Sequence, residues 1–146
     1  MTESPRISVS HVGVCASDLA RSVRFYTEAL GFVLDYYVDV GAPFDVLTEL
    51  PGLECRIGFF RQDGLRIELA GYASPDVVGT PERRPMNQVG LTHLSLVVED
   101  IDAVTERIVT FGGRVYPQTK VATPKGRLIF CTDPDGVRIE LWQKAE

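Results

Sequence analysis

An internal repeat constrains the fold of this chain more than any other feature. Segment 133–142 reads DPDGVRIELW, and segment 61–72 reads RQDGLRIELAGY. A second pair lies upstream of these, SHVGVCASDLA at 10–20 and THLSLVVEDID at 92–102. Such self-similarity indicates a duplicated supersecondary unit. We therefore expect the 146 residues to form one domain, 1–146, made of two half-size modules.

The spacing of the repeated residues predicts an insertion in the first copy. His11 and His93 are 82 positions apart, whereas Glu68 and Glu140 are 72 positions apart. The first copy thus has about ten more residues between its helix and its last strand. The segment GAPFDVLTELPG, 41–52, is the predicted place of this insertion.

Residue periodicity predicts the order βαβββ in each module. In the first module, alternating apolar residues and turn signals predict strands at 7–15, 32–40, 53–61 and 65–70, with a helix that begins at Ser17 or Asp18 and ends at Leu30. In the second, they predict strands at 91–98, 114–116, 127–132 and 137–143, with a helix capped by Asp100 or Asp102. The proline-rich segment of about 73–88 is the predicted linker between modules of about 5–72 and 89–144.

Charge and composition narrow the class of protein. The net charge is −5 without a basic stripe, which argues against nucleic acid as a partner. No apolar run approaches the ~20 residues that a membrane-spanning helix needs. The amino-terminal MTESPRIS lacks the features of a signal peptide, and the three cysteines form no CxxC pair. We therefore expect a soluble, cytoplasmic protein that acts on a small molecule.

Four residues of the repeat form a candidate metal site. Apolar residues alternate with them along each strand, such as Val12 and Val14 after His11 and Leu94 and Leu96 after His93. Strand alternation therefore places His11, Glu68, His93 and Glu140 on the face opposite to the packed one. Alone, each has an ordinary interpretation as a hydrogen-bonded or solvated side chain. Together they recur at equivalent places of both copies, and histidine with carboxylate is the ligand set of divalent Zn, Ni, Co, Mn and Fe. The sequence therefore predicts one divalent metal ion.

The repeated segments resemble the vicinal oxygen chelate superfamily. The resemblance covers nearly the whole chain and is carried by HVGVCASDLARSVRFYTEALGF, GLRIEL, GLTHLSLVVEDIDAV and DPDGVRIELW, in the expected order. This superfamily includes glyoxalase I, methylmalonyl-CoA epimerase, extradiol dioxygenases, and fosfomycin or bleomycin resistance proteins. The resemblance implies an α+β fold in which two βαβββ modules form a curved mixed sheet around a cleft.

The resemblance also implies a function for the four residues. They fall on the metal-ligand positions, in the set typical of glyoxalase I, whereas methylmalonyl-CoA epimerases have Gln where Glu68 stands. The implied activity is proton abstraction next to a carbonyl, by a lyase or an isomerase, with Glu140 as the leading base and Glu68 as ligand and second candidate base. An extradiol-type dioxygenase and a non-catalytic drug-sequestering protein are the alternatives. Family members commonly pair modules within one chain or across a dimer, so we expect a homodimer.

Other candidate residues carry weaker signals. Three basic residues are candidate anchors for a substrate carboxylate or phosphate: Arg56, Lys125 and Arg127. Cys15 shares the strand face of His11, but a small buried thiol is the expected interpretation.

Overall fold

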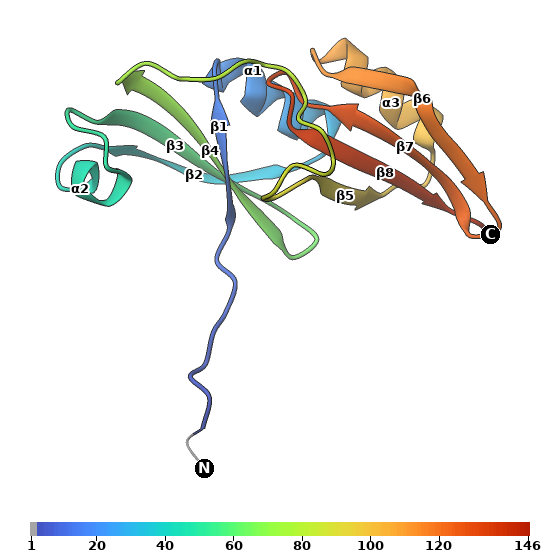
Figure 1. Ribbon diagram of the computed structural model, residues 1–146, viewed down its shortest axis with the longest axis horizontal. Helices are drawn as coiled ribbons and strands as arrows, with labels where there is room; N and C mark the ends of the chain where they lie inside the picture. The colour runs from blue at the N-terminus through green and yellow to red at the C-terminus, as the bar shows by residue number, and fades with distance from the viewer. Residues whose placement is uncertain (1–2) are drawn as a thin grey trace.

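The computed structural model describes residues 3–146 and contains two four-stranded mixed sheets, one for each copy of the repeat. The strand order is β1-β4-β3-β2 in the first sheet and β5-β8-β7-β6 in the second. In each sheet the first strand lies at an edge, parallel to the last strand, and the other pairs are antiparallel. Figure 1 shows the sheets as two separate units. The predicted α+β fold of two βαβββ modules is confirmed.

The first module follows the predicted order of elements. Its elements are β1 (Val12–Ala16), α1 (Leu19–Arg24), a π-helical turn η1 (Phe25–Ala29), β2 (Val33–Val40), α2 (Phe44–Thr48), β3 (Glu54–Gln62) and β4 (Leu65–Ser74). Asp18 caps α1, because its carboxylate accepts a hydrogen bond from the Arg21 amide at 3.0 Å. Asp63 and Gly64 have φ of 46° and 82°, the left-handed conformation that a two-residue hairpin turn needs.

The second module repeats this order without the insertion. Its elements are β5 (Leu94–Val97), α3 (Ile101–Thr110), β6 (Arg114–Thr123), β7 (Gly126–Thr132) and β8 (Arg138–Lys144). Asp100 caps α3 by accepting hydrogen bonds from the backbone amides of Asp102 and Ala103 at 3.0 Å. The two helices thus begin in the same way at equivalent places of the repeat.

One apolar core joins the modules through their helix-bearing faces. Fully buried residues of η1, such as Phe25, belong to the same cluster as Ile108 of α3 and Ile139 of β8. A buried polar contact crosses the same junction, where the Tyr26 hydroxyl donates to Asp133 Oδ2 at 2.9 Å. Burial raises the pKa of both of these groups. Because the core occupies the helix-bearing face of each sheet, residues that alternate with core residues point to the opposite face.

The structure departs from several of the predicted boundaries. Strand β4 continues past the predicted residue 70 to Ser74, and β5 begins at Leu94 rather than at residue 91. The first strand begins at Val12 rather than at residue 7, and residues 3–10 form an exposed arm that leaves the body of the protein (Figure 1). The insertion at 41–52 contains the short helix α2, which the two prolines had not suggested. Strand β6 continues to Thr123, well beyond the predicted residue 116.

The segment between the modules has no regular structure. Strand β4 ends at Ser74 and β5 begins at Leu94, and no helix or strand lies between them. The division at about 73–88 stays a prediction with which this order of elements is compatible. Within residues 3–146, no helix is both long enough and apolar enough to span a bilayer.

Candidate metal centre

The first module holds His11 and Glu68 side by side. His11 directly precedes β1, and Glu68 lies on β4, where it pairs in register with Gly13. The His11 Nε2 atom is 3.1 Å from Glu68 Oε2. The Ser10 hydroxyl lies 2.8 Å from His11 Nδ1, and the imidazole ring packs edge-on against Phe59 with centroids 5.3 Å apart. We call His11 and Glu68 with these supporting groups the first half-site.

The second module repeats this arrangement around His93 and Glu140. The Thr92 hydroxyl lies 2.8 Å from His93 Nδ1, and the His93 ring packs edge-on against Phe130 at 5.4 Å. Glu140 of β8 pairs in register with Ser95 of β5, whose hydroxyl donates to Glu140 Oε1 at 2.7 Å. We call His93 and Glu140 with their supporting groups the second half-site.

Each half-site offers donors that suit a divalent metal. A hydroxyl can donate or accept a hydrogen bond, so Ser10 and Thr92 can support either tautomer of the adjacent ring through Nδ1. With Nδ1 held in this way, Nε2 is the nitrogen that remains to bind a metal, as outer-sphere partners commonly arrange for metal-binding histidines. One imidazole and one carboxylate are two of the four ligands that zinc and similar ions take.

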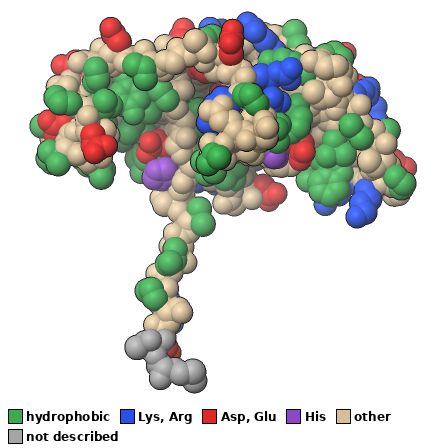
Figure 2. All heavy atoms as spheres, viewed as in Figure 1, with side chains coloured by type: hydrophobic (Ala, Val, Ile, Leu, Met, Phe, Trp, Pro, Cys, Tyr) green, Lys and Arg blue, Asp and Glu red, His purple; other side chains and the backbone are tan. Residues whose placement is uncertain are grey.

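The two half-sites do not meet within one chain. Among residues 3–146, no group of three or more His, Cys, Asp and Glu side chains is close enough to hold a metal ion. Figure 2 shows the two histidines as separate patches on the surface. The structure therefore brings His11 into contact with Glu68, whereas Glu140 accepts a hydrogen bond from Ser95. The four-ligand site stays a prediction.

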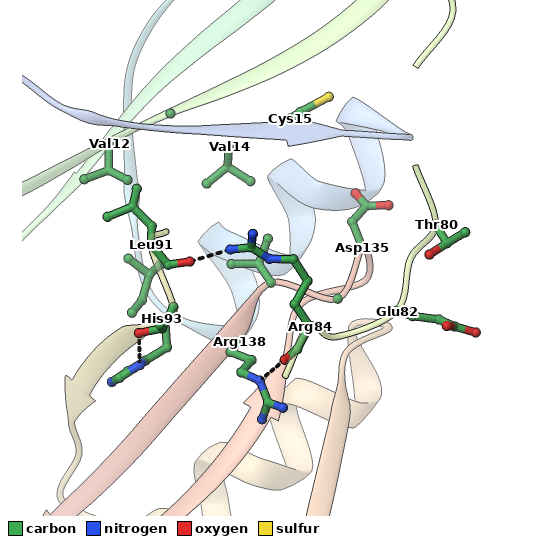
Figure 3. Close-up of a pocket in the computed structure, with 15 residues that line it drawn as sticks. Val12, Val14, Cys15, Thr80, Glu82, Arg84, Leu91, His93, Asp135 and Arg138 are labelled. Atoms are coloured by element: carbon green, nitrogen blue, oxygen red, sulfur yellow. Dashed lines mark hydrogen bonds between the residues drawn. The ribbon is translucent and has the colours of Figure 1, made fainter. Parts of the chain in front are cut away.

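A cavity of about 400 Å³ lies between the modules, beside the second half-site. Val12 and Val14 of β1 point into it from one side, and His93, Arg84 and Arg138 line the other (Figure 3). It contains neither Glu68 nor Glu140 among its lining residues. This cavity thus borders one histidine without including a complete set of ligands.

The predicted basic anchors lie away from the half-sites or are already paired. The Arg56 guanidinium contacts Asp39 at 3.2 Å, and alternation along β3 places Arg56 on the face opposite to Phe59. Arg127 donates to Asp102 and to Gln143. Lys125 lies in the turn between β6 and β7.

Sequence reasoning missed two other arginines that are close to the half-sites. Arg66 Cζ lies 4.7 Å from the Phe59 centroid, and Arg138 Cζ lies 5.4 Å from the Phe130 centroid. Both belong to the repeated RIEL sequence, two residues before the glutamate and hence on its strand face. The repeat itself was the signal that could have identified them.

The cysteines have the character of structural thiols. Cys15 is exposed, so the expectation of a buried thiol was wrong there, whereas Cys55 and Cys131 are buried. Partial desolvation still raises the pKa of Cys15, with a smaller contribution from the negative charge of Asp135. Burial raises the pKa of Cys131 to about 12. A raised pKa keeps these thiols protonated at neutral pH.

A duplicated βαβββ fold with a histidine and a carboxylate at equivalent places of each copy defines a class of small, two-module proteins. Residues 8–141 match the family model of the Glyoxalase/Bleomycin resistance protein/Dioxygenase superfamily. The chain belongs to this family.

Known proteins agree with this membership. The chain is 30% identical to a 2-epi-5-epi-valiolone epimerase from Actinomyces sp., over 92% of this chain and 78% of that protein. A glyoxalase family protein from Bacillus cereus superposes with a TM-score of 0.87 at 20% identity, covering 100% of this chain and 99% of that one. The fosfomycin resistance protein FosX from Listeria monocytogenes superposes with a TM-score of 0.64 at 20% identity, covering 94% of this chain and 92% of that one. That structure is of a glutamate-to-glutamine mutant in complex with Mn(II) and 1S,2S-dihydroxypropylphosphonic acid. The chain also matches two longer relatives, from Mycobacterium bovis and Mycobacterium tuberculosis, at 27% identity. It spans 44% of the length of each of them.

Proposed function

We propose that this protein is a divalent-metal-dependent enzyme that enolises its substrate by removing a proton next to a carbonyl, as a glyoxalase-like lyase or an epimerase-like isomerase. The observation that carries the proposal is the duplicated half-site. In both modules a hydroxyl holds Nδ1 of a histidine, a phenylalanine packs against its ring, and a glutamate stands on the neighbouring strand face. Two such halves together supply two imidazoles and two carboxylates.

In this proposal the metal site is completed between two chains of a homodimer. The halves are apart within one chain, so His11 and Glu68 of one protomer would meet His93 and Glu140 of its partner. Two further features support self-association. Strands β1 and β5 are edge strands, whose free backbone groups favour pairing with another strand. Large apolar side chains are also exposed on β2 and α2, including Tyr36, Phe44, Val46 and Leu47 (Figure 2).

The carboxylates of the site provide the proton chemistry. A divalent metal held by these residues would polarise adjacent substrate oxygens and stabilise the negative charge of the enolate. Glu140 is the leading general base, because the Ser95 hydroxyl holds Oε1 and leaves Oε2 without a protein partner among the described residues. Glu68 is the second candidate, and His11 and His93 serve as ligands. Apolar core residues on either side of each glutamate keep its strand in place.

Mixed dimers test the shared site. His11→Ala and His93→Ala should each abolish stoichiometric metal binding, measured by elemental analysis. In a heterodimer of the two variants, both changes fall in one site and the other site is intact. Random exchange of equal amounts gives about half heterodimers, so about a quarter of all sites should regain metal. Wild-type metal content in either variant alone would reject the ligands, and no recovery on mixing would reject the shared site.

The reaction is tested separately. Proton NMR in deuterated water follows exchange of the hydrogen next to the carbonyl in hemithioacetals of 2-oxoaldehydes and in 2-methyl-branched acyl-CoA esters. Exchange by the metal-loaded enzyme and none after chelation is the expected result. Metal-independent exchange, or oxygen-dependent cleavage of catechols by an iron-loaded protein, would contradict enolisation.

A further inference from the structure

We infer that Arg66 binds an anionic group, a carboxylate or a phosphoryl group, of the substrate that reaches the first half-site. The inference rests on the proposed function in one respect, the position of the substrate's chelating oxygens beside His11 and Glu68. The contacts that single out Arg66 do not depend on the metal.

The first argument is position. Arg66 precedes Glu68 by two residues on β4, so both side chains stand on one face about 6.6 Å apart at their origins. The guanidinium lies against two neighbouring rings, with Cζ 4.7 Å from the Phe59 centroid and 5.4 Å from the Tyr36 centroid, and the centroids of these two rings are 5.0 Å apart. Phe59 is also the ring against which His11 packs. The aromatic contacts hold the arginine in a fixed orientation beside the candidate metal ligands.

The second argument is that Arg66 has unused hydrogen-bond donors. Its Nε is buried and has no hydrogen-bond partner among the described residues. The nearest carboxylate oxygen, Asp35 Oδ2, is 3.8 Å away, too far for a hydrogen bond. Asp35 is held instead by Arg61, whose Nε donates to it at 2.6 Å. A buried donor without an acceptor is costly, and an anion is the acceptor that a guanidinium binds best.

The third argument is the contrast with Arg138, the repeat counterpart of Arg66. Arg138 stacks on Phe130 in the same way, but its Nε donates to the backbone carbonyl of Arg84 at 2.8 Å. In the second module this donor thus fixes the linker over the cavity (Figure 3). In the first module no described residue accepts the equivalent hydrogen bond, so the buried Nε of Arg66 has no acceptor in this structure.

The fourth argument is space. A hollow of about 600 Å³ is lined by Arg66 together with Asp35, Arg61 and residues of the β3–β4 turn. The charged residues of this wall are two guanidiniums, of Arg61 and Arg66, and two carboxylates, of Asp35 and Asp63, so their formal charges balance. The short separation between Arg66 and Glu68 selects a compact substrate, whose anionic group lies a few bonds from the oxygens that chelate the metal.

The test uses two anions that carry a methyl group, acetate and methylphosphonate. Each is titrated into the chelator-treated protein, and the proton NMR line of its methyl group gives the dissociation constant. Arg66→Gln should weaken binding about ten-fold or more, because charge-assisted hydrogen bonds are lost. Arg56→Gln is the matched control, since Arg56 also stacks on a tyrosine and contacts an aspartate, but on the opposite face of β3. It should change binding less than about two-fold. Circular dichroism checks that both variants are folded.

Loading with Mn(II) then reports where the anion binds, because the paramagnetic ion broadens the methyl line of a nearby ligand. Whichever anion shows Arg66-dependent binding identifies the chemical group. The inference is overturned if neither anion binds, if Arg66→Gln binds as wild type does, or if both variants lose affinity equally. Failure of the protein to bind Mn(II) or any other of the candidate divalent ions would instead reject the proposed function, while Arg66-dependent anion binding would stand.

Discussion

The two half-sites share their framework but differ in the partner of the glutamate. Glu68 faces the imidazole of His11, with Oε2 3.1 Å from Nε2. Glu140 accepts a hydrogen bond from Ser95 instead, at 2.7 Å. The difference follows from one repeat position, because the residue that pairs with the glutamate is Gly13 in the first module and Ser95 in the second.

This difference shows what duplication preserves and what it leaves free to change. Backbone pairing, the hydroxyl behind each histidine and the phenylalanine beside it are the same in both modules. The hydrogen-bond partners of the charged groups differ between the modules. Glu140 accepts a hydrogen bond from Ser95 and Arg138 donates one to a backbone carbonyl, whereas Glu68 and Arg66 lack the equivalent partners. Two copies of one ligand set can therefore take unequal roles, one carboxylate as the base and the other mainly as a ligand.

The largest expected effect comes from exchanging each carboxylate for an amide. Glu140→Gln should retain fold and most metal but lower the rate of substrate hydrogen exchange by ~10² to 10⁴-fold, because an amide cannot accept the proton. Glu68→Gln should lower it less. Exchange by proton NMR and metal by elemental analysis separate the two roles. A larger loss for Glu68→Gln would reverse the assignment of the base.

A smaller effect is expected from the hydroxyls behind the histidines. Ser10→Ala and Thr92→Val should each weaken metal affinity by about 10- to 100-fold, because the imidazole loses the contact that orients it. Competition with a chromophoric chelator measures the affinity. Since the two contacts have the same length, the two losses should be similar. An effect in one variant alone would show that only one half-site binds the metal.

Changing the residue beside each glutamate should have a modest effect. Ser95→Ala removes one hydrogen bond to Glu140 and should lower kcat/KM by less than about ten-fold. Gly13→Ser adds a hydroxyl next to Glu68 without a clash, since a Cβ there would lie 3.7 Å from Glu68 Oε1. Steady-state kinetics of both variants tests the comparison directly. A loss in Ser95→Ala as large as in Glu140→Gln would show that the hydroxyl itself takes part in proton transfer.

Removal of the metal is expected to have the smallest effect, because it should leave the fold unchanged. The core lies on the helix-bearing faces of both sheets, and the half-sites lie on the opposite faces. The chelated protein should therefore keep its far-ultraviolet circular dichroism spectrum and melt cooperatively. An unfolded chain after chelation would show that the half-sites contribute to the core.

Local signals in the sequence were enough for most of the fold. Asp18 and Asp100 cap the helices, and Asp63 and Gly64 form the hairpin turn, because these features depend on contacts between near neighbours. The first strand is shorter than predicted, because a strand extends only as far as it has a neighbouring strand to pair with. Val12 pairs with Ile67, and β4 begins only two residues earlier, so the arm at 3–10 runs beyond its partner strand.

The sequence by itself determined which face of each strand the four candidate ligands occupy, because alternation along a strand is a local property. It also determined that the two sets are equivalent, through the repeat. Only the tertiary structure decided that His11–Glu68 and His93–Glu140 remain apart in one chain, that Arg56 faces away from the half-site, and that Arg66 stacks beside it with a donor unused. These outcomes depend on how the modules pack and on the side chains of neighbouring strands, and no period or spacing within one strand encodes such contacts.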